Sequence, residues 1–491
     1  MSKQPNGTAG SRRAFLKAGA GLAAGAALPV VAPLQVSAQV SQAADPELAR
    51  LQSQPRILLK GGVVLTMDRQ AGHFANADVL IENGRIREVR PDIAASDVVT
   101  IDASNRIITP GFADTHSHSY QGILRNILSN GRVDPDYNRD IVGKITPAYT
   151  PQDAYVGMQA TALGMIDMGT TCVVDLSQVN NTPEHSDALV KALQDAGIRA
   201  VFGYSAGTAG PGMQHPQDIA RLKRTHFSSK NQLLTLALGI GPDPKMFQVA
   251  RDHDVPVVAH LRNTLPQRDD GARLKALSQA GLLRPGDEFI HLLHMPPEPL
   301  QLIKDSGCHV SLSTAIEMTM GHGIPAIQNV LDVGLQPSLS SDHAVTLSSD
   351  MFSMMRMTGV VQRYGVYERE RANAQNAPKL LTCRELLEFG TINGARCANV
   401  DGKVGTLTPG KEADLLMLKA DSIDVWPLNN AYGAVVNLMG PAHVEAVFIA
   451  GRVKKWRGNL VGVDMPRVLR SMQEARDGVL RRANFPINLF G

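Results

Sequence analysis

Histidine and aspartate residues are spaced along this chain in a way that suits metal chemistry. His116 and His118 end an apolar run, and on a strand two residues at this spacing face the same side. His260, His291 and Asp342 each stand at the end of a later apolar run. Imidazoles and a carboxylate that converge on one divalent cation form a hydrolytic site with room for a water molecule. The pattern indicates such a centre, provided that the fold brings these runs together.

The middle of the chain alternates apolar strand patterns with helical patterns, which predicts a (β/α)8, TIM-like barrel. Helical stretches such as Pro183–Ala196, which Gly197 ends, separate the strands. The eight expected strands lie at 111–114, 171–176, 199–204, 233–240, 255–260, 289–293, 309–312 and 335–340. The five residues above then lie at the carboxyl ends of strands one, five, six and eight, where barrels of this kind carry their chemistry.

The two flanks of the barrel are rich in short alternating strands and turns, among them a hairpin turn at Asn83 and Gly84. They predict a small composite β-sandwich domain formed by both ends of the chain. The full fold class is then α/β, a (β/α)8 barrel with that second domain. The predicted segments are a leader at 1–38, sandwich strands at 55–109, the barrel at 110–398, further sandwich strands at 399–460 and a helical tail at 461–491.

Three motifs resemble one known family. They read ITPGFADTHSH at 108–118, TINGAR at 391–396 and VGTLTPGKEADL at 404–415. The sequence resembles the amidohydrolase superfamily, in its triazine-hydrolase and cytosine-deaminase-like branch, over residues 57–453. The resemblance implies that His116, His118, His260 and Asp342 bind the metal. It also implies that His291 polarises the substrate and that Asp342 moves a proton from the attacking water to the leaving nitrogen.

The expected cofactor is one divalent metal ion. Members of the superfamily with two metals bridge them through a lysine on the fourth strand, and the stretch 233–240 contains no lysine. Zinc suits a site of several imidazoles and one carboxylate, and iron is the alternative.

The sequence departs from the family pattern after the fifth strand. Deaminases of this branch read His-x-x-Glu there, and the glutamate protonates the ring under attack. Here Asn263 takes that place, and an amide cannot transfer a proton. We retain Asn263 as a candidate for substrate binding. Glu317, after the seventh strand, is a candidate for the missing acid and for substrate binding; its alternative is a solvated or ion-paired surface residue.

His294 and His343 are further candidates for the substrate pocket, because either could protonate a leaving group. The alternative for both is a hydrogen-bonded wall residue. Asp342, His291 and Glu317 form the expected catalytic set.

The predicted function is metal-dependent hydrolysis of a non-peptide C–N bond in a small heterocyclic or N-substituted molecule, by attack of a metal-bound hydroxide. Deamination of a ring and cleavage of an amide, urea or carbamate are rival forms of this reaction. Some superfamily relatives have lost the metal and serve as binding proteins, but all four expected ligands are present here.

The first 38 residues resemble a twin-arginine signal peptide, with Arg12 and Arg13 before a mildly apolar stretch and a small-residue cleavage site at 36–38. The alternatives are a Sec signal or an anchor helix. The resemblance implies recognition by the twin-arginine export machinery and a periplasmic mature protein, with no membrane attachment after the signal is removed.

The charge balance gives no sign of a nucleic-acid partner. Net charge is +3, but four of the 49 basic residues lie in the leader, and 45 remain against 46 acidic ones. The expected partner is a small-molecule substrate, and analogy with the family favours a homo-oligomer.

The four cysteines form no CxxC pair and are predicted to be buried free thiols, with two disulfides as the alternative. They are Cys172, Cys308, Cys383 and Cys397.

Overall fold

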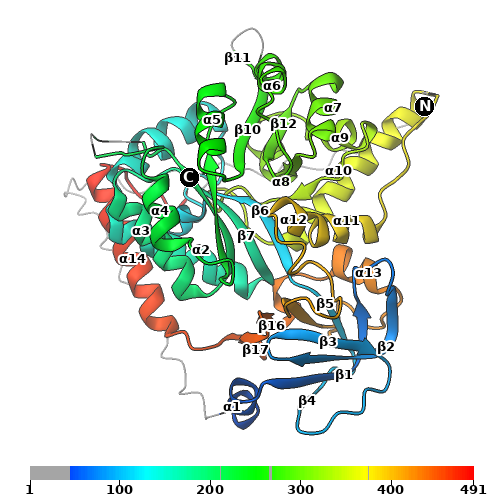
Figure 1. The fold of residues 1–491 in the computed structure, drawn as a ribbon. Helices are drawn as coiled ribbons and strands as arrows, with labels where there is room; N and C mark the ends of the chain where they lie inside the picture. Colours follow the sequence, from blue (N-terminus) through cyan, green and yellow to red (C-terminus); the bar gives the residue numbers. More distant parts are fainter. Residues whose placement is uncertain (1–44, 209, 211, 265–267, 374, 491) are drawn as a thin grey trace, which may run out of the picture. The chain divides into compact units, whose positions relative to one another are not determined.

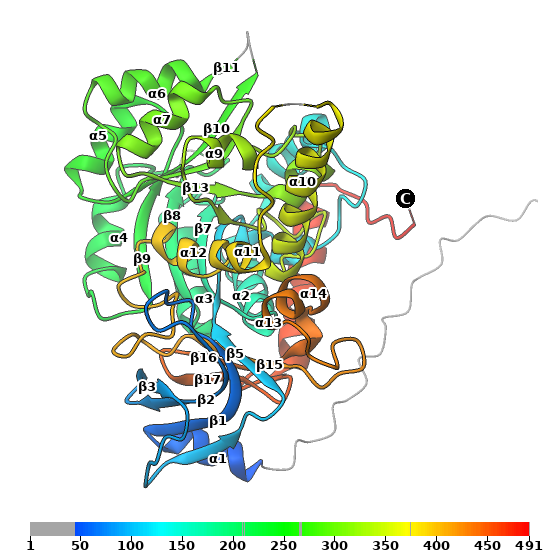
Figure 2. The ribbon, with the colours of Figure 1, turned by 90° about the vertical axis from the view of Figure 1, so that its right-hand side faces the viewer.

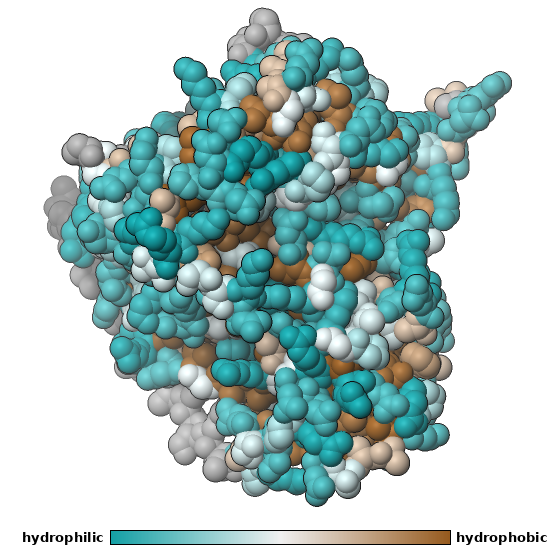
Figure 3. All heavy atoms as spheres, in the orientation of Figure 1, coloured by the Kyte–Doolittle hydropathy of each residue, from teal (hydrophilic) through white to brown (hydrophobic). Residues whose placement is uncertain are grey.

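The computed structural model describes residues 45–490, apart from 209, 211, 265–267 and 374. The predicted signal peptide at 1–38 lies outside these residues. None of the helices in the described chain is both long and apolar enough to cross a bilayer. Hydrophilic residues cover most of the face drawn in Figure 3.

Eight parallel strands form the predicted barrel, each hydrogen-bonded to the next (Figures 1 and 2). In chain order they are β6 (Phe112–Ser117), β7 (Thr170–Ser177), β8 (Arg199–Ser205), β9 (Leu234–Gly239), β10 (Val257–Thr264), β12 (Glu288–Leu293), β13 (His309–Leu312) and β14 (Ser338–Leu339). A parallel bridge between Ser117 and Asp342 brings the last strand back to the first and nearly closes the barrel. The predicted α/β, TIM-like barrel is thus confirmed.

Every expected strand is present with small shifts of its bounds, and proline explains the later starts of two of them. The fifth and eighth strands begin at Val257 and Ser338, directly after Pro256 and Pro337. Proline has no N–H to give to a ladder and is therefore excluded from the middle of a sheet. The fifth strand also continues past His260, because it pairs with the short strand β11 (Arg268–Asp269).

Helices follow most strands and cover the outside of the barrel. They are α2 (Pro151–Asp167), α3 (Pro183–Ala196), α4 (Ile219–His226), α5 (Pro244–Asp252), α6 (Asp270–Gln279), α7 (Pro297–Asp305), α8 (Thr314–Thr319), α9 (Ile327–Asp332), α10 (Met351–Arg371), α11 (Cys383–Phe389) and α12 (Ile392–Cys397). Helix α3 has the predicted bounds, since proline occupies its first turn and Gly197 adopts a left-handed φ of 67° directly after it.

Strands from both flanks join in one further sheet. It contains β1 (Arg56–Leu65), β2 (His73–Glu82), β3 (Arg85–Arg90), β4 (Val99–Asp102) and β5 (Arg106–Pro110) from the first flank, and β15 (Leu415–Lys419), β16 (Val444–Ile449), β17 (Arg452–Trp456) and β18 (Asn459–Leu460) from the second. The antiparallel pair β5–β15 unites the two groups. Both central residues of the β2–β3 turn, Asn83 and Gly84, have positive φ, as the predicted hairpin requires. A sandwich arrangement of these strands stays a prediction.

A buried ion pair fastens this sheet to the barrel. Arg199, at the start of β8, is 1% exposed. Its Nε donates to Asp414 Oδ2 at 2.9 Å and its Nη2 to Glu412 Oε2 at 2.7 Å. Asp414 lies in the third sequence motif, so this part of the motif serves the assembly of the fold.

The C-terminal tail forms helix α14 (Met465–Arg482), which packs along α2. Arg482 of α14 bonds to Asp153 and donates to the Ala148 carbonyl at 2.8 Å. All four cysteines are free, as predicted, although Cys383 is only half-buried.

Candidate metal centre and active site

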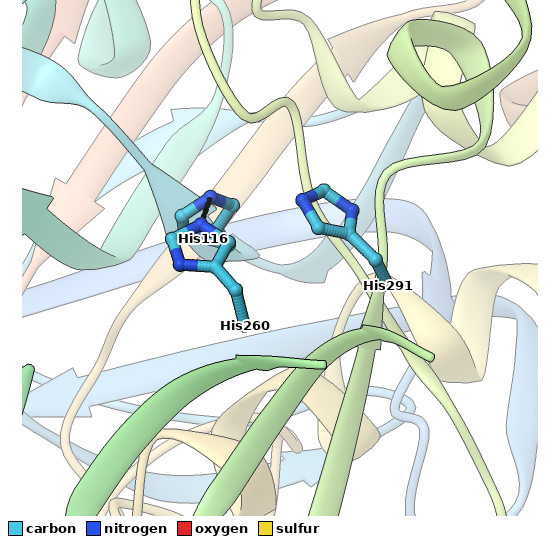
Figure 4. A group of neighbouring side chains, drawn as sticks. All are labelled: His116, His260 and His291. Carbon is cyan, nitrogen blue, oxygen red and sulfur yellow. Dashed lines mark hydrogen bonds between the residues drawn. The ribbon is translucent and has the colours of Figure 1, made fainter. Parts of the chain in front are cut away.

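The predicted ligands meet at the carboxyl ends of the barrel strands. His116 lies in β6 and His118 directly follows it, His260 lies in β10, and Asp342 follows β14. The backbone N–H of Asp342 donates to the His116 carbonyl at 2.9 Å, so closure of the barrel places the carboxylate beside the histidine pair. Figure 4 shows the rings of His116, His260 and His291 around a common space, with His260 and His291 on neighbouring strands.

The donor atoms are close enough to share one cation. Nε2 of His116 lies 3.2 Å from Nε2 of His260 and 3.3 Å from Oδ1 of Asp342. Nε2 of His118 lies 3.5 Å from the same carboxylate oxygen. Two facing ring nitrogens cannot both donate to each other, whereas a cation between them satisfies both lone pairs. The buried donor set therefore fits a metal ion.

Hydrogen bonds behind two of the rings fix their orientation. Nδ1 of His118 lies 2.8 Å from the Leu176 carbonyl oxygen, and since that oxygen only accepts, Nδ1 carries the proton. Nε2 is left with its lone pair on the side of Asp342. His291 likewise donates from Nδ1 to Oε1 of Glu317 at 2.9 Å, which directs its Nε2 toward Asp342 Oδ2, 3.8 Å away. Such partners set both the tautomer and the aim of a ligand.

Electrostatics favour neutral imidazoles at His116, His118 and His260 beside one charged carboxylate. Burial lowers the pKa of His116 to about 3, and burial also lowers the pKa values of His118 and His260. Burial alone would raise the pKa of Asp342, but the surrounding histidines, His343 first, hold it well below its usual value. Neutral imidazoles and an ionised carboxylate are the forms that bind a metal.

The backbone is strained where the chain turns into the site. His291 has a φ of 69° and Asp342 a φ of 62°, in the left-handed region that non-glycine residues seldom adopt. Leu292 and His294 share this conformation. Strain of this kind persists only where the surrounding structure enforces it, and it is concentrated at functional sites.

A cavity of about 220 Å³, hereafter the site cavity, opens beside these residues. Its volume is below the range usual for pockets that hold drug-sized molecules, which indicates a small ligand. Its wall is formed by His118, Val133, Tyr137, Asn138, Val142, Gln178, His260, Leu261, Arg262, Arg268, His291, Leu293, His322, Asp342 and His343.

The further candidates from the sequence lie in different places. His343 lines the site cavity and stacks on Tyr137, with ring centres 4.9 Å apart. Glu317 is fully buried and contacts His291 from behind, outside the lining. Asn263 also lies outside the lining, where its Oδ1 accepts from the Gly271 N–H at 3.1 Å. His294 is exposed and is not part of the lining.

Sequence reasoning missed two cavity residues of chemical interest. His322 contacts the ring of His291 edge-on, with centres 5.3 Å apart, and its buried Nε2 has no hydrogen-bond partner among the described residues. Burial, followed by nearby positive groups, lowers its pKa to about 4. Arg262, two residues after His260, is the other. Two features of the sequence could have indicated these residues. His322 has a glycine on each side, and Arg262 lies inside the altered His-x-x-Glu motif.

Comparison with known proteins agrees with this geometry. The amidohydrolase family model matches residues 107–454. A 5-methylthioadenosine/S-adenosylhomocysteine deaminase of Caldicellulosiruptor saccharolyticus is 23% identical over 442 residues, which cover 85% of this chain and 97% of the relative. A 5'-deoxyadenosine deaminase of Methanosarcina barkeri is 23% identical over 449 residues, covering 87% and 99%.

Two solved structures share the fold. An adenosine deaminase from Xanthomonas campestris with bound zinc has a TM-score of 0.74 at 21% identity, covering 87% of this chain and 98% of that one. Atrazine chlorohydrolase TrzN from Arthrobacter aurescens, complexed with zinc, has a TM-score of 0.73 at 22% identity, covering 86% and 100%. With the family model matching well over half of its length, the chain belongs to the amidohydrolase family, as a metal-dependent hydrolase of C–N bonds other than peptide bonds.

Proposed function

We propose that this protein cleaves an amide, urea or carbamate C–N bond in a small molecule and releases an amine. One observation carries this choice. Asp342 is the only carboxylate among the described residues that line the site cavity. The reaction must therefore proceed without a second carboxylic acid of the protein in contact with the substrate.

The donor set supports a single divalent ion, with zinc as the proposed metal. His116, His118, His260 and Asp342 would hold it, since three imidazoles and one carboxylate are typical zinc ligands. The fourth strand, β9, contains no lysine that could bridge a second ion. A bound cation would lower the pKa of a water molecule toward neutrality and so make a nucleophile available without a strong base.

The residues of the chain divide the remaining work. Asp342 is ionised and lines the site cavity, so it can accept the proton of the attacking water. It can then pass this proton to the leaving nitrogen. His291 donates its Nδ1–H to Glu317 and presents Nε2 to the same space. Burial lowers the pKa of His291, but the bond to Glu317 and the charge of Asp342 outweigh burial and raise it, and in the protonated ring Nε2–H can donate to the carbonyl oxygen of the substrate.

Amide-type cleavage fits these groups better than ring deamination. An amine leaves from a tetrahedral intermediate, and a single proton carrier is enough for that step. Attack on an aromatic ring needs a separate acid for the ring nitrogen. Asn263 cannot supply that proton, and its side chain lies outside the site cavity.

Deamination is the second candidate, favoured by a different observation. Both curated relatives described above are named as deaminases, and His322 offers a buried, unpartnered Nε2 inside the site cavity. In this alternative His322 takes the place of the missing glutamate as proton donor.

Mass spectrometry of products separates the two reactions. The zinc-loaded mature protein is incubated with aminated pyrimidines, purines and triazines beside aryl amides, ureas and carbamates. Two carbon-bearing fragments are the expected result. Ammonia with one ring-hydroxylated product would overturn the proposal in favour of deamination.

We further infer from the resemblance of the leader that the protein is exported by the twin-arginine route and works in the periplasm. This route carries folded proteins, so a metal can be loaded before export.

A further inference from the structure

Arg262 differs from the other partly buried arginines of this protein. Within the described residues, every other arginine that is buried or half-buried donates its guanidinium to an oxygen of the protein. Arg199 binds Asp414, Arg251 binds Asp287, and Arg356 donates to the Met439 carbonyl at 2.7 Å. The guanidinium of Arg262 has no hydrogen-bond or ion-pair partner among the described residues, although it is half-buried.

The neighbouring carboxylate does not neutralise this charge. Asp270 accepts from the backbone N–H of Arg262 at 2.9 Å and from Arg268 Nε at 2.7 Å. Arg268 also donates to the His260 carbonyl at 3.2 Å. Asp270 thus fixes the backbone of Arg262 and is itself paired with Arg268, while the guanidinium of Arg262 stays free in the wall of the site cavity.

The position of this free charge links it to the reaction. Arg262 lines the site cavity together with His260 and His291. It lies two residues after His260 on β10, so both side chains leave the strand on the same side. A group that binds Arg262 is therefore held next to the metal ligands.

A half-buried cation without a partner costs free energy, and proteins normally pair or neutralise it. Arg262 is left unpaired in the wall of the site cavity, where a small molecule can reach it. We propose that the substrate carries a carboxylate group, which Arg262 binds through its paired N–H donors. This rests on the proposed function, and it narrows the substrate to small N-acyl or N-carbamoyl carboxylic acids.

A carboxylate suits the site better than a phosphate. One guanidinium presents one planar fork, which matches the two oxygens of a single carboxylate. The other arginine of the wall, Arg268, is already paired with Asp270, so among the described residues the site cavity offers one free guanidinium group for one anionic group.

The test is equilibrium binding of matched probe pairs to the zinc-loaded mature protein, by calorimetry. The pairs are 4-oxopentanoate with its methyl ester, and 4-acetylbenzoate with its methyl ester. A ketone replaces the amide, so no probe contains a C–N bond to cleave, and within each pair a carboxylate is replaced by a neutral ester. We expect the carboxylate of at least one pair to bind roughly 10- to 100-fold more tightly, the range typical of a charge-assisted hydrogen-bonded contact.

Variants assign this preference to the residue. In Arg262→Gln the ratio within the pair should fall to about one, whereas Arg262→Lys, which keeps the charge and loses the fork, should retain part of it. The matched control is Arg273→Gln. Arg273 also contacts Asp270, at 3.5 Å, but it is exposed on α6 and lies outside the cavity wall, so its variant should keep the full ratio. Zinc content and the thermal unfolding midpoint verify that each variant is folded and loaded.

Several results would overturn the anion site. Two of them are equal binding within both pairs and no saturable binding of either carboxylate. A third is a preference that survives in Arg262→Gln, which would mean that the metal binds the carboxylate directly. The fourth is tighter binding of inorganic phosphate than of any carboxylate. These readouts need no turnover. An Arg262-dependent preference without amide-type products would therefore contradict the proposed reaction and leave the anion site standing.

Discussion

At the level of single residues, the site depends on what stands behind each imidazole. The carbonyl of Leu176 and the carboxylate of Glu317 each hold an Nδ1–H, so the opposite nitrogen of His118 and of His291 faces the cavity. Free rotation of either ring would cost conformational entropy at the moment of binding. The rings are instead fixed before any ligand arrives.

Removal of a proposed ligand tests the metal centre. We expect His116→Ala, His260→Ala and Asp342→Ala each to reduce zinc from about one ion per chain to a trace, because each variant removes one of the four donors that would hold the ion. Turnover should be lost with the metal. Elemental analysis of the purified variants measures the zinc content, and a product assay measures the turnover. His73→Ala, an exposed histidine on β2, is the control. Full zinc occupancy in any of the three would exclude that residue as a ligand.

Glu317 is expected to position His291. Glu317→Ala should reduce kcat by about 10- to 100-fold, the usual effect of losing a partner behind a metal-site histidine. Glu317→Gln should cost much less, since its amide oxygen can still accept from Nδ1. The ratio of the two kcat values is the measurement, with Glu298→Gln on the surface as control. Equal, large losses in both variants would instead indicate that Glu317 transfers a proton, because neither alanine nor glutamine can.

At the level of elements, the strands of the barrel could be predicted from the sequence, whereas the directions of several side chains could not. Apolar runs of four to eight residues between helical patterns locate buried parallel strands well. The direction of the Asn263 side chain could not be predicted from the sequence. Strand β10 continues past His260, so Asn263 lies on the face of the strand opposite Arg262. His294 comes three residues after His291. His291 and Leu292 form a turn with left-handed φ values, and the periodicity of the sequence does not reveal such a turn.

A substitution of Arg199 tests how the flanking sheet is joined to the barrel. Arg199→Ala leaves Asp414 buried without its partner, so we expect a loss of about 3–5 kcal/mol in the free energy of unfolding. Urea denaturation measures this loss. The control is Lys191→Ala, whose exposed i,i+4 pair with Asp195 should contribute less than about 0.5 kcal/mol. A loss for Arg199→Ala as small as that of the control would mean that the sheet stays attached by other contacts.

At the level of the whole molecule, we propose that the leader decides in which compartment the reaction takes place. We expect Arg12→Lys combined with Arg13→Lys to retain the precursor in the cytoplasm, since the proposed export route reads the arginine pair. Cell fractionation followed by immunoblotting measures the distribution, and Lys3→Arg is the control outside the pair. Undiminished export of the double variant would point to a Sec signal.

The pairing of β5 with β15 also has a consequence for biosynthesis. The first five strands of the flanking sheet are made early, but the edge of β5 receives its partner only when residues 415–419 leave the ribosome. Until then an apolar strand edge, a known template for aggregation, is exposed. Truncations before Leu415 should therefore accumulate as insoluble chains even though every barrel strand is present, because the flanking sheet is completed only when its strands from the second flank have been made.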